Sequence, residues 1–243
     1  MAQEASYPPL DTPKRVAEEV WVVDSGPQRV LGLRLPVRMT VLRLAGGGLW
    51  LHSPTRHTPR LAAALTELGP IAHLVAPNTA HWTHLSPWQK AFPEASLWAA
   101  PGVVGRARDQ GTELRAAGEL PASPPPPWAG EIEQVAFGGP GFAEIAFFHH
   151  ASRSLVLTDL VQAMEASRLP LGTGLLARMV GAASGGDTPA HLRLLLNRRR
   201  EENRAAAERL LALGPARVIF AHGAFFAEDG AARLRRALGW LLG

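Results

Sequence analysis

The sequence contains no cysteine, and this absence removes several classes of site at once. Without thiols the chain forms no disulfide, holds no zinc ion or iron–sulfur cluster through sulfur, and offers no cysteine nucleophile. Any metal ion must therefore be bound by histidine and carboxylate side chains. Such ligands suit zinc, iron or manganese in an open, catalytic type of site better than a structural zinc site.

Long apolar runs and a secretion leader are also missing. No stretch approaches the roughly 18–20 apolar residues of a membrane-spanning helix. Residues 1–9 lack the basic start and the apolar run of a secretion signal. We therefore expect a soluble, cytoplasmic protein without a membrane partner.

Lysine is scarce and occurs only as Lys14 and Lys90, whereas the other cationic side chains are arginines. The formal net charge is +4. The densest basic cluster, residues 198–200, is followed by Glu201 and Glu202 on a predicted helix. Charges of mixed sign are typical of a solvated helix surface, whereas a nucleic-acid site needs unopposed basic residues. We therefore expect no nucleic-acid partner.

Hydrophobic residues make up 47% of the 243 positions, enough for a substantial core, and we expect a single domain over residues 1–243. Predicted strands cover 20–23, 39–44, 49–52, 71–76, 96–99, 132–137, 143–148, 155–158 and 217–221. Predicted helices cover 58–68, 87–92, 189–213 and 228–242, whereas 121–128 is irregular and 160–186 is ambiguous. An α/β (α+β) protein with two sheets face to face and helices outside accounts for this order.

Three predicted strands are followed by residues of the types that bind metals. His81 and His84 lie in the loop after strand 71–76, Asp159 follows strand 155–158, and His222 stands in a turn after strand 217–221. A strand end that delivers two histidines into a loop is a common way to build a metal site.

These residues resemble the motifs of the metallo-β-lactamase superfamily. Its hallmark is a strand ending in H-x-H-x-D-H, then a later strand ending in a metal-bridging Asp and a C-terminal strand ending in His-Gly. Residues 79–84, 155–159 and 219–223 match these motifs in order and spacing. Shorter stretches, such as 38–41 and 49–54, resemble an uncharacterised branch. The resemblance implies a four-layer αββα sandwich.

The chain departs from the superfamily motifs in ways that imply a degenerate site. Thr79 stands where the first histidine is expected, and Thr83 where the aspartate of the D-H pair is expected. Residues 138–141 replace the usual mid-chain Gly-His, and Ser53 replaces an aspartate that often supports the site. The full two-metal ligand set is therefore absent.

The residues that do match are His81, His84, Asp159 and His222. The resemblance implies one zinc, iron or manganese ion at His84, Asp159 and His222, with His81 as fourth ligand or proton handler. With His81 and Asp159 as catalytic residues, such a site would hydrolyse a small ester, lactone or phosphoester. The alternative is a metal-free, non-catalytic member of the fold that binds a small ligand or a protein partner in the same cleft.

Four further residues are candidates for substrate contacts: His52, His149, His150 and Arg153. His52 ends a predicted strand beside Ser53. Its side chain either lines the cleft or is that of an ordinary hydrogen-bonded histidine. His149 and His150 are adjacent on a strand, so their side chains point to opposite faces. Either one of these two rings faces the cleft, or one ring is partly buried and the other faces solvent. Arg153 is either an anion contact or a surface arginine.

Overall fold

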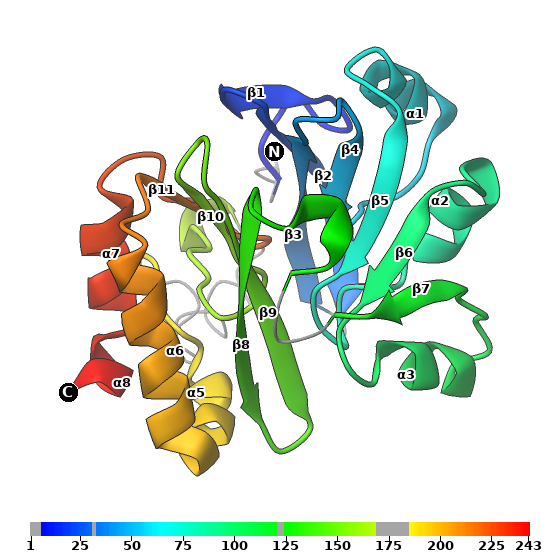
Figure 1. Ribbon diagram of the computed structural model, residues 1–243. Coiled ribbons are helices and arrows are strands. Elements are labelled where there is room, and N and C mark those ends of the chain that lie inside the picture. Colours follow the sequence, from blue (N-terminus) through cyan, green and yellow to red (C-terminus); the bar gives the residue numbers. More distant parts are fainter. Residues whose placement is uncertain (1–5, 31–32, 121–123, 169–184) are drawn as a thin grey trace.

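The computed structural model describes residues 6–30, 33–120, 124–168 and 185–243. Two β-sheets form its centre (Figure 1). Helices α1 to α3 lie on the outer side of the first sheet, and α5 to α8 lie on the outer side of the second. The predicted αββα arrangement of two sheets between helices is confirmed.

The first sheet has seven strands in chain order. They are β1 Lys14–Ala17, β2 Val20–Val30, β3 Leu33–Arg43, β4 Leu49–His52, β5 Ile71–Ala76, β6 Ser96–Ala99 and β7 Ala116–Glu119. The strands from β1 to β4 pair antiparallel, and those from β4 to β7 pair parallel.

The second sheet has four strands in the order β11-β10-β9-β8. They are β8 Ile132–Gly139, β9 Phe142–His149, β10 Ser154–Val156 and β11 Arg217–Ile219. Because β10 and β11 are parallel, the chain leaves both strands at the same edge of the sheet. Asp159 and His222 follow these two strands, so the topology brings them together.

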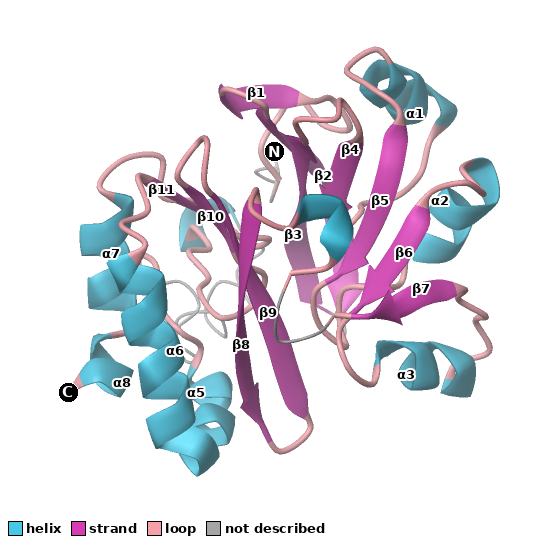
Figure 2. Cartoon of the chain, viewed as in Figure 1, coloured by secondary structure: helices cyan, strands magenta, loops and turns pink. Residues whose placement is uncertain are grey.

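Helices α1 to α3, α5 and α6 lie between strands in the sequence, and α7 and α8 follow the last strand (Figure 2). The first sheet carries α1 Pro59–Thr66, α2 Leu85–Ala91 and α3 Val103–Asp109, and the second carries α5 Ala190–Leu196, α6 Arg200–Ala212, α7 Gly230–Ala237 and α8 Gly239–Leu242. Single 3₁₀ turns occur at Pro126–Trp128, Ala166–Arg168 and Asn197–Arg199. Among the helices of the described residues, none is long and apolar enough to cross a membrane.

Apolar side chains fill the spaces between the layers. Trp50 of β4 contacts Phe147 of β9, with ring centroids 4.9 Å apart, and so joins the two sheets. On the outer face of the second sheet, Leu192, Leu210 and Leu234 of three different helices are buried in one cluster. Burial of such side chains stabilises each by about 1.5–3 kcal/mol relative to exposure.

The helix predicted over 189–213 is divided in the structure. Helix α5 ends at Leu196, and α6 begins at Arg200 after a 3₁₀ turn. The side-chain amide of Asn203 donates to the carbonyl of Leu196 at 2.8 Å and so satisfies a carbonyl at the end of α5. The helix predicted over 228–242 is likewise two helices, with the break at Leu238.

Elements β1, α3 and β7 were not predicted. The side chains of β7 are almost all exposed, and those of β1 are half-buried or exposed, so neither strand shows a clear alternation of apolar and polar residues. Of the irregular segment 121–128, residues 121–123 lie outside the described residues, and the buried Trp128 stands in a 3₁₀ turn between β7 and β8. Of the ambiguous segment 160–186, residues 169–184 lie outside the described residues.

Candidate metal centre

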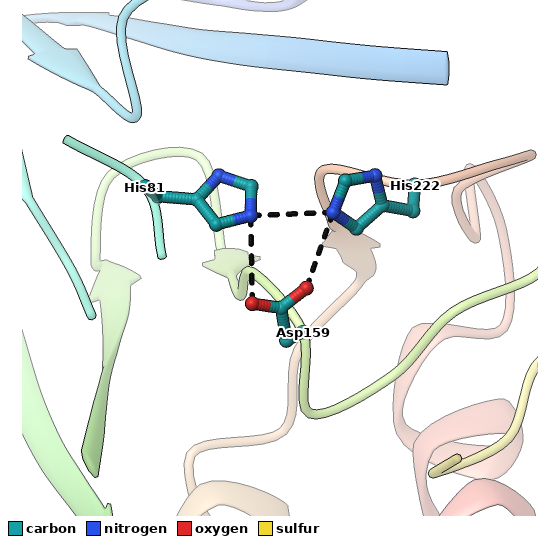
Figure 3. Close-up of side chains that lie close together, drawn as sticks. All are labelled: His81, Asp159 and His222. Atoms are coloured by element: carbon teal, nitrogen blue, oxygen red, sulfur yellow. Dashed lines mark hydrogen bonds and ion pairs between the residues drawn. The ribbon is translucent and has the colours of Figure 1, made fainter. Parts of the chain in front are cut away.

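Three polar side chains from three separate loops meet in one place. His81 lies in the turn between β5 and α2, Asp159 follows β10, and His222 follows β11. Figure 3 shows that the three side chains point toward one another. The Nε2 atom of His81 lies 3.4 Å from Oδ2 of Asp159 and 3.2 Å from Nε2 of His222. The Nε2 atom of His222 lies 3.1 Å from Oδ1 of Asp159.

The ring of His222 is fixed by a backbone carbonyl of the first sheet. Its Nδ1 atom lies 2.7 Å from the carbonyl oxygen of Pro36 on β3, and the residue is 5% exposed. A carbonyl oxygen only accepts hydrogen bonds, so Nδ1 carries the proton and donates. In the neutral ring, Nε2 therefore presents a lone pair to His81 and Asp159. Metal-binding histidines are usually held in this way.

Gly223 allows the chain to turn tightly after His222. Its φ angle is +98°, and a Cβ atom at this position would lie 2.1 Å from the carbonyl oxygen of Ala163. The backbone N–H of Ala163 in turn donates to the carbonyl of His222 at 3.1 Å. The His-Gly pair noted in the sequence therefore has a steric reason, since only glycine fits this backbone conformation and approach.

The ring of His81 is oriented by Ser53, at the end of β4. The Oγ atom of Ser53 lies 2.6 Å from Nδ1 of His81. Ser53 has a φ angle of +53°, and its N–H donates to the carbonyl of Val75 at 2.9 Å. This left-handed conformation is uncommon for a residue with a side chain and is often found at functional sites. It leaves the Nε2 atom of His81 free to face Asp159.

The carboxylate of Asp159 is held by two side-chain amides. Asn78 donates to Oδ2 at 2.8 Å, and Gln162 donates to Oδ1 at 3.2 Å. The backbone N–H of Asp159 donates to Oε2 of Glu144 at 2.8 Å. Asp159 therefore has a fixed orientation that does not depend on the two histidines.

The charges of the three groups depend on one another. Burial would raise the pKa of Asp159, but the charges and hydrogen bonds of His81 and His222 hold it well below its usual value. Burial would also lower the pKa of His222, but the hydrogen bond and charge of Asp159 and the carbonyl of Pro36 raise it. Asp159 is therefore a carboxylate that attracts a cation, either a metal ion or a proton on His222.

The donor set fits a divalent metal ion. The ligand atoms of His81, Asp159 and His222 all lie within 4.8 Å of one another. With both Nδ1 atoms engaged elsewhere, the two Nε2 atoms and a carboxylate converge on one point. Two histidines and one carboxylate form an open site that suits zinc, iron(II) or manganese, with positions left for water or substrate.

His84, which the sequence suggested as a ligand, lies outside this group. Within the part of the chain that the structure describes, the converging ligand atoms belong to His81, Asp159 and His222. His84 is the residue before α2 and is half-buried. Burial lowers its pKa, and the nearby charges of Arg56 and His81 lower it further. His81 therefore stands in the place beside Asp159 and His222 that we had expected for His84.

His52 is buried in the core. It is 1% exposed, with its ring centroid 5.7 Å from that of Trp50 and 5.5 Å from that of Phe147. Burial lowers the pKa of His52 to about 3, and the charge of His81 also lowers it. The expectation that His52 binds substrate is therefore not supported by its position.

The other three candidate contacts lie at the far end of the second sheet. His149 pairs with Ser154 at the start of β10, whereas Asp159 follows the end of that strand. His150 and Arg153 stand in the turn that joins β9 to β10, and Arg153 is exposed and donates to the carbonyl of Gly214. These three residues therefore do not line the site of Asp159, because the length of β10 separates them from it.

Sequence reasoning missed Glu144 and Asn78, which are buried beside the site. Glu144 is 0% exposed and accepts the backbone N–H groups of Thr158, Asp159 and Leu160. Burial and the charge of Asp159 raise its pKa to about 7, against the opposing effect of these three bonds. The available signal was an acidic residue inside an apolar strand, since a buried carboxylate needs hydrogen-bond partners.

The chain has the metallo-β-lactamase fold. The metallo-β-lactamase from Pontibacter korlensis matches with a TM-score of 0.62 and 13% identity, over 94% of this chain and 97% of that one. The DIM-1 metallo-β-lactamase matches with a TM-score of 0.63 and 14% identity, over 94% and 95% of the two chains. At such identities the likeness shows the fold alone.

A model of the family described as "Domain of unknown function (DUF4336)" matches residues 17–172, and the chain belongs to this family. The match includes His81 and Asp159 and ends before His222. A third solved structure with the same fold is the metallo-β-lactamase FIM-1 from Pseudomonas aeruginosa in its mono-zinc form. It has a TM-score of 0.61 and 13% identity, over 95% of this chain and 92% of that one. No curated protein matches the sequence.

Proposed function

We propose that the protein binds one divalent metal ion through His81, Asp159 and His222 and hydrolyses a small ester, lactone or phosphoester. One observation carries the proposal: the two Nε2 atoms lie 3.2 Å apart, and each ring is fixed through its Nδ1 atom. These Nε2 atoms also lie 3.4 Å (His81) and 3.1 Å (His222) from oxygens of Asp159, so a cation between the three groups would have two imidazole nitrogens and a carboxylate as ligands. The mono-zinc form of FIM-1 supports the idea that this fold accommodates a single ion.

A bound ion of this kind lowers the pKa of a water ligand to about 7 and polarises a carbonyl or phosphoryl oxygen. The residues of the chain supply the rest of the site. Asp159 contributes the negative charge, and the two rings contribute neutral donors with fixed orientation. Thr83 is exposed and accepts a hydrogen bond from Gln28 at 3.2 Å, so position 83 provides no carboxylate for a second ion. Zinc suits this chemistry, and iron(II) and manganese suit the same ligands.

A second candidate function follows from the raised pKa of His222. A proton on its Nε2 would form an ion pair with Asp159 across 3.1 Å and would close the network without a metal ion. In that case the protein binds a small ligand or a protein partner at this place and performs no hydrolysis. The two candidates differ in metal content and in turnover, so both are measurable on the same preparation.

The test begins with untagged protein purified without chelator. Its zinc, iron and manganese content is measured before and after incubation with excess zinc and desalting. Chromogenic esters, lactones and phosphodiesters are then assayed with and without added metal. About one equivalent of metal and metal-dependent turnover support the hydrolase. A protein that neither contains nor takes up metal contradicts it and favours the binding role.

A further inference from the structure

Two buried side chains outside the ligand set join the ligand loops of the two sheets. Asn78 precedes His81 in the turn after β5, and Glu144 lies on β9 beside the loop that carries Asp159. They are 1% and 0% exposed. Their backbones form an isolated antiparallel bridge, and the N–H of Ile145 donates to the carbonyl of Pro77 at 3.0 Å. The sheets are therefore tied to each other directly behind the candidate metal centre.

The side-chain amide of Asn78 uses its full hydrogen-bonding capacity. Its oxygen accepts the backbone N–H groups of Ala80 and His81 at 2.9 and 3.0 Å. Its nitrogen donates to Oδ2 of Asp159 at 2.8 Å and to Oε2 of Glu144 at 3.3 Å. The reverse orientation would turn the oxygen toward two carboxylates, so the network fixes one orientation. One side chain thus sets the position of both the His81 turn and the Asp159 carboxylate.

The carboxylate of Glu144 fixes the backbone on which Asp159 stands. Its Oε1 accepts the N–H of Thr158 at 2.8 Å, and its Oε2 accepts the N–H of Asp159 at 2.8 Å. The N–H of Leu160 lies 3.3 and 3.2 Å from the same two oxygens. Three successive N–H groups therefore point at one buried side chain, and this holds the loop after β10 in a single conformation.

We infer that Asn78 and Glu144 are positioning residues that hold His81 and Asp159 in ligand geometry before an ion binds. The inference rests on the proposed function, because it gives the pair a role in metal affinity. Partners of metal ligands change affinity by about 10–100-fold when they are removed, because an ion must then order its own ligands. The competing interpretation is that the pair stabilises the fold and has no specific effect on the ion.

The chain offers a matched control for this distinction. Asn203 on α6 is 2% exposed and bonds backbone groups through both ends of its amide. It accepts the N–H of Gly138 at 3.0 Å and donates to the carbonyls of Gly138 and Leu196, each at 2.8 Å. It packs on the outer face of the second sheet, among helices α5 and α6. Asn203→Ala therefore removes a comparable buried network that contains none of the candidate ligands.

The variants are Asn78→Ala, Glu144→Gln and Asn203→Ala in the full chain. Glu144→Gln keeps the side-chain volume, and in either orientation its new amide hydrogens face a backbone N–H. Each protein is first checked for cooperative thermal unfolding. The dissociation constant for Zn²⁺ is then measured by competition with a chromophoric chelator, and the visible spectrum of bound Co²⁺ reports the ligand geometry.

We expect the two site variants to bind Zn²⁺ about 10–100-fold more weakly than the wild type and to show altered Co²⁺ bands. The Asn203→Ala protein should unfold at a lower temperature but keep the wild-type affinity and spectrum. If Asn78→Ala does not fold, Glu144→Gln decides the question. Wild-type affinity and spectrum in Glu144→Gln would overturn the inference, whereas a wild type that binds neither ion would overturn the proposed function instead.

Discussion

At the scale of single residues, the candidate site depends on where two imidazole protons lie. Pro36 and Ser53 engage the Nδ1 atoms of His222 and His81, so the Nε2 atoms face each other and Asp159. The carbonyl of Pro36 belongs to the backbone and cannot be removed by substitution. Ser53 can be substituted, and its substitution tests directly whether it orients the ring of His81.

We expect Ser53→Ala to weaken Zn²⁺ binding by about tenfold, because the ring of His81 loses the partner that fixes it. The measurement is the dissociation constant from chelator competition. Ser152→Ala is the matched control, since the Oγ of Ser152 lies 2.8 Å from Nδ1 of His149 at the far end of the sheet. Equal effects of the two substitutions would show that the contact with Ser53 has no specific role.

A second prediction at this scale concerns His52 and pH. Burial lowers its pKa to about 3 from the ordinary 6.5, so the folded state keeps the ring neutral. Between these values the unfolded state binds more protons, and stability therefore falls as the pH is lowered through this window. The contribution of one such group is at most about 1.4 kcal/mol per pH unit.

The matched variant is His52→Phe, which keeps an aromatic ring beside Trp50. Urea unfolding between pH 4 and 7 should show a shallower pH dependence for the variant than for the wild type. Parallel curves for the two proteins would mean that His52 takes up a proton without loss of the fold.

At the scale of elements, β3 holds the strand end that carries His222. Arg38 on β3 donates through Nη1 to the carbonyls of Phe220 and Gly223, at 3.0 and 2.7 Å. Its Nη2 lies 2.7 Å from Oδ1 of Asp24 on the neighbouring strand β2. Both side chains of this ion pair are almost fully buried. The first sheet therefore fixes the backbone on both sides of His222.

We expect Arg38→Leu to lower the free energy of unfolding by about 3–5 kcal/mol, because removal of one partner leaves a buried charge uncompensated. Because Lys14 also contacts Asp24, we expect a loss near the lower end of this range. Arg43→Leu on the same strand is the control, since its ion pair with Glu19 is partly exposed and solvent screens its contribution to stability. Chemical denaturation measures both, and similar losses would contradict the role of the buried pair.

The elements also show how far the sequence alone could lead. The strands before His81, Asp159 and His222 are apolar runs bounded by turn residues, so their existence and order could be predicted. The division of helix 189–213 could not, because it depends on the contact of Asn203 with Leu196 and Gly138 across the tertiary structure. Strand β7 could not be predicted either, since pairing with β6 rather than its own pattern defines it.

At the scale of the whole molecule, the parallel pair β10 and β11 and the end of β5 bring three distant loops together. The resemblance gave four candidate ligands and placed the ion at His84, Asp159 and His222, with His81, three positions before His84, as fourth ligand or proton handler. The position of His81 beside Asp159 depends on its contacts with Asn78 and Ser53, which the sequence spacing does not reveal. The role of Glu144 could not be predicted from the sequence either, because its hydrogen-bond partners are backbone groups of another loop.

The metal content of four proteins tests the central claim most directly: the wild type, His81→Ala, His222→Ala and His84→Ala. Each is purified without tag or chelator, loaded with zinc and desalted before elemental analysis. We expect about one equivalent of zinc in the wild type and in His84→Ala, and little in His81→Ala or His222→Ala. Loss of zinc in His84→Ala with retention in His81→Ala would contradict the proposed ligand set, and a wild type without zinc would contradict the proposed metal centre itself.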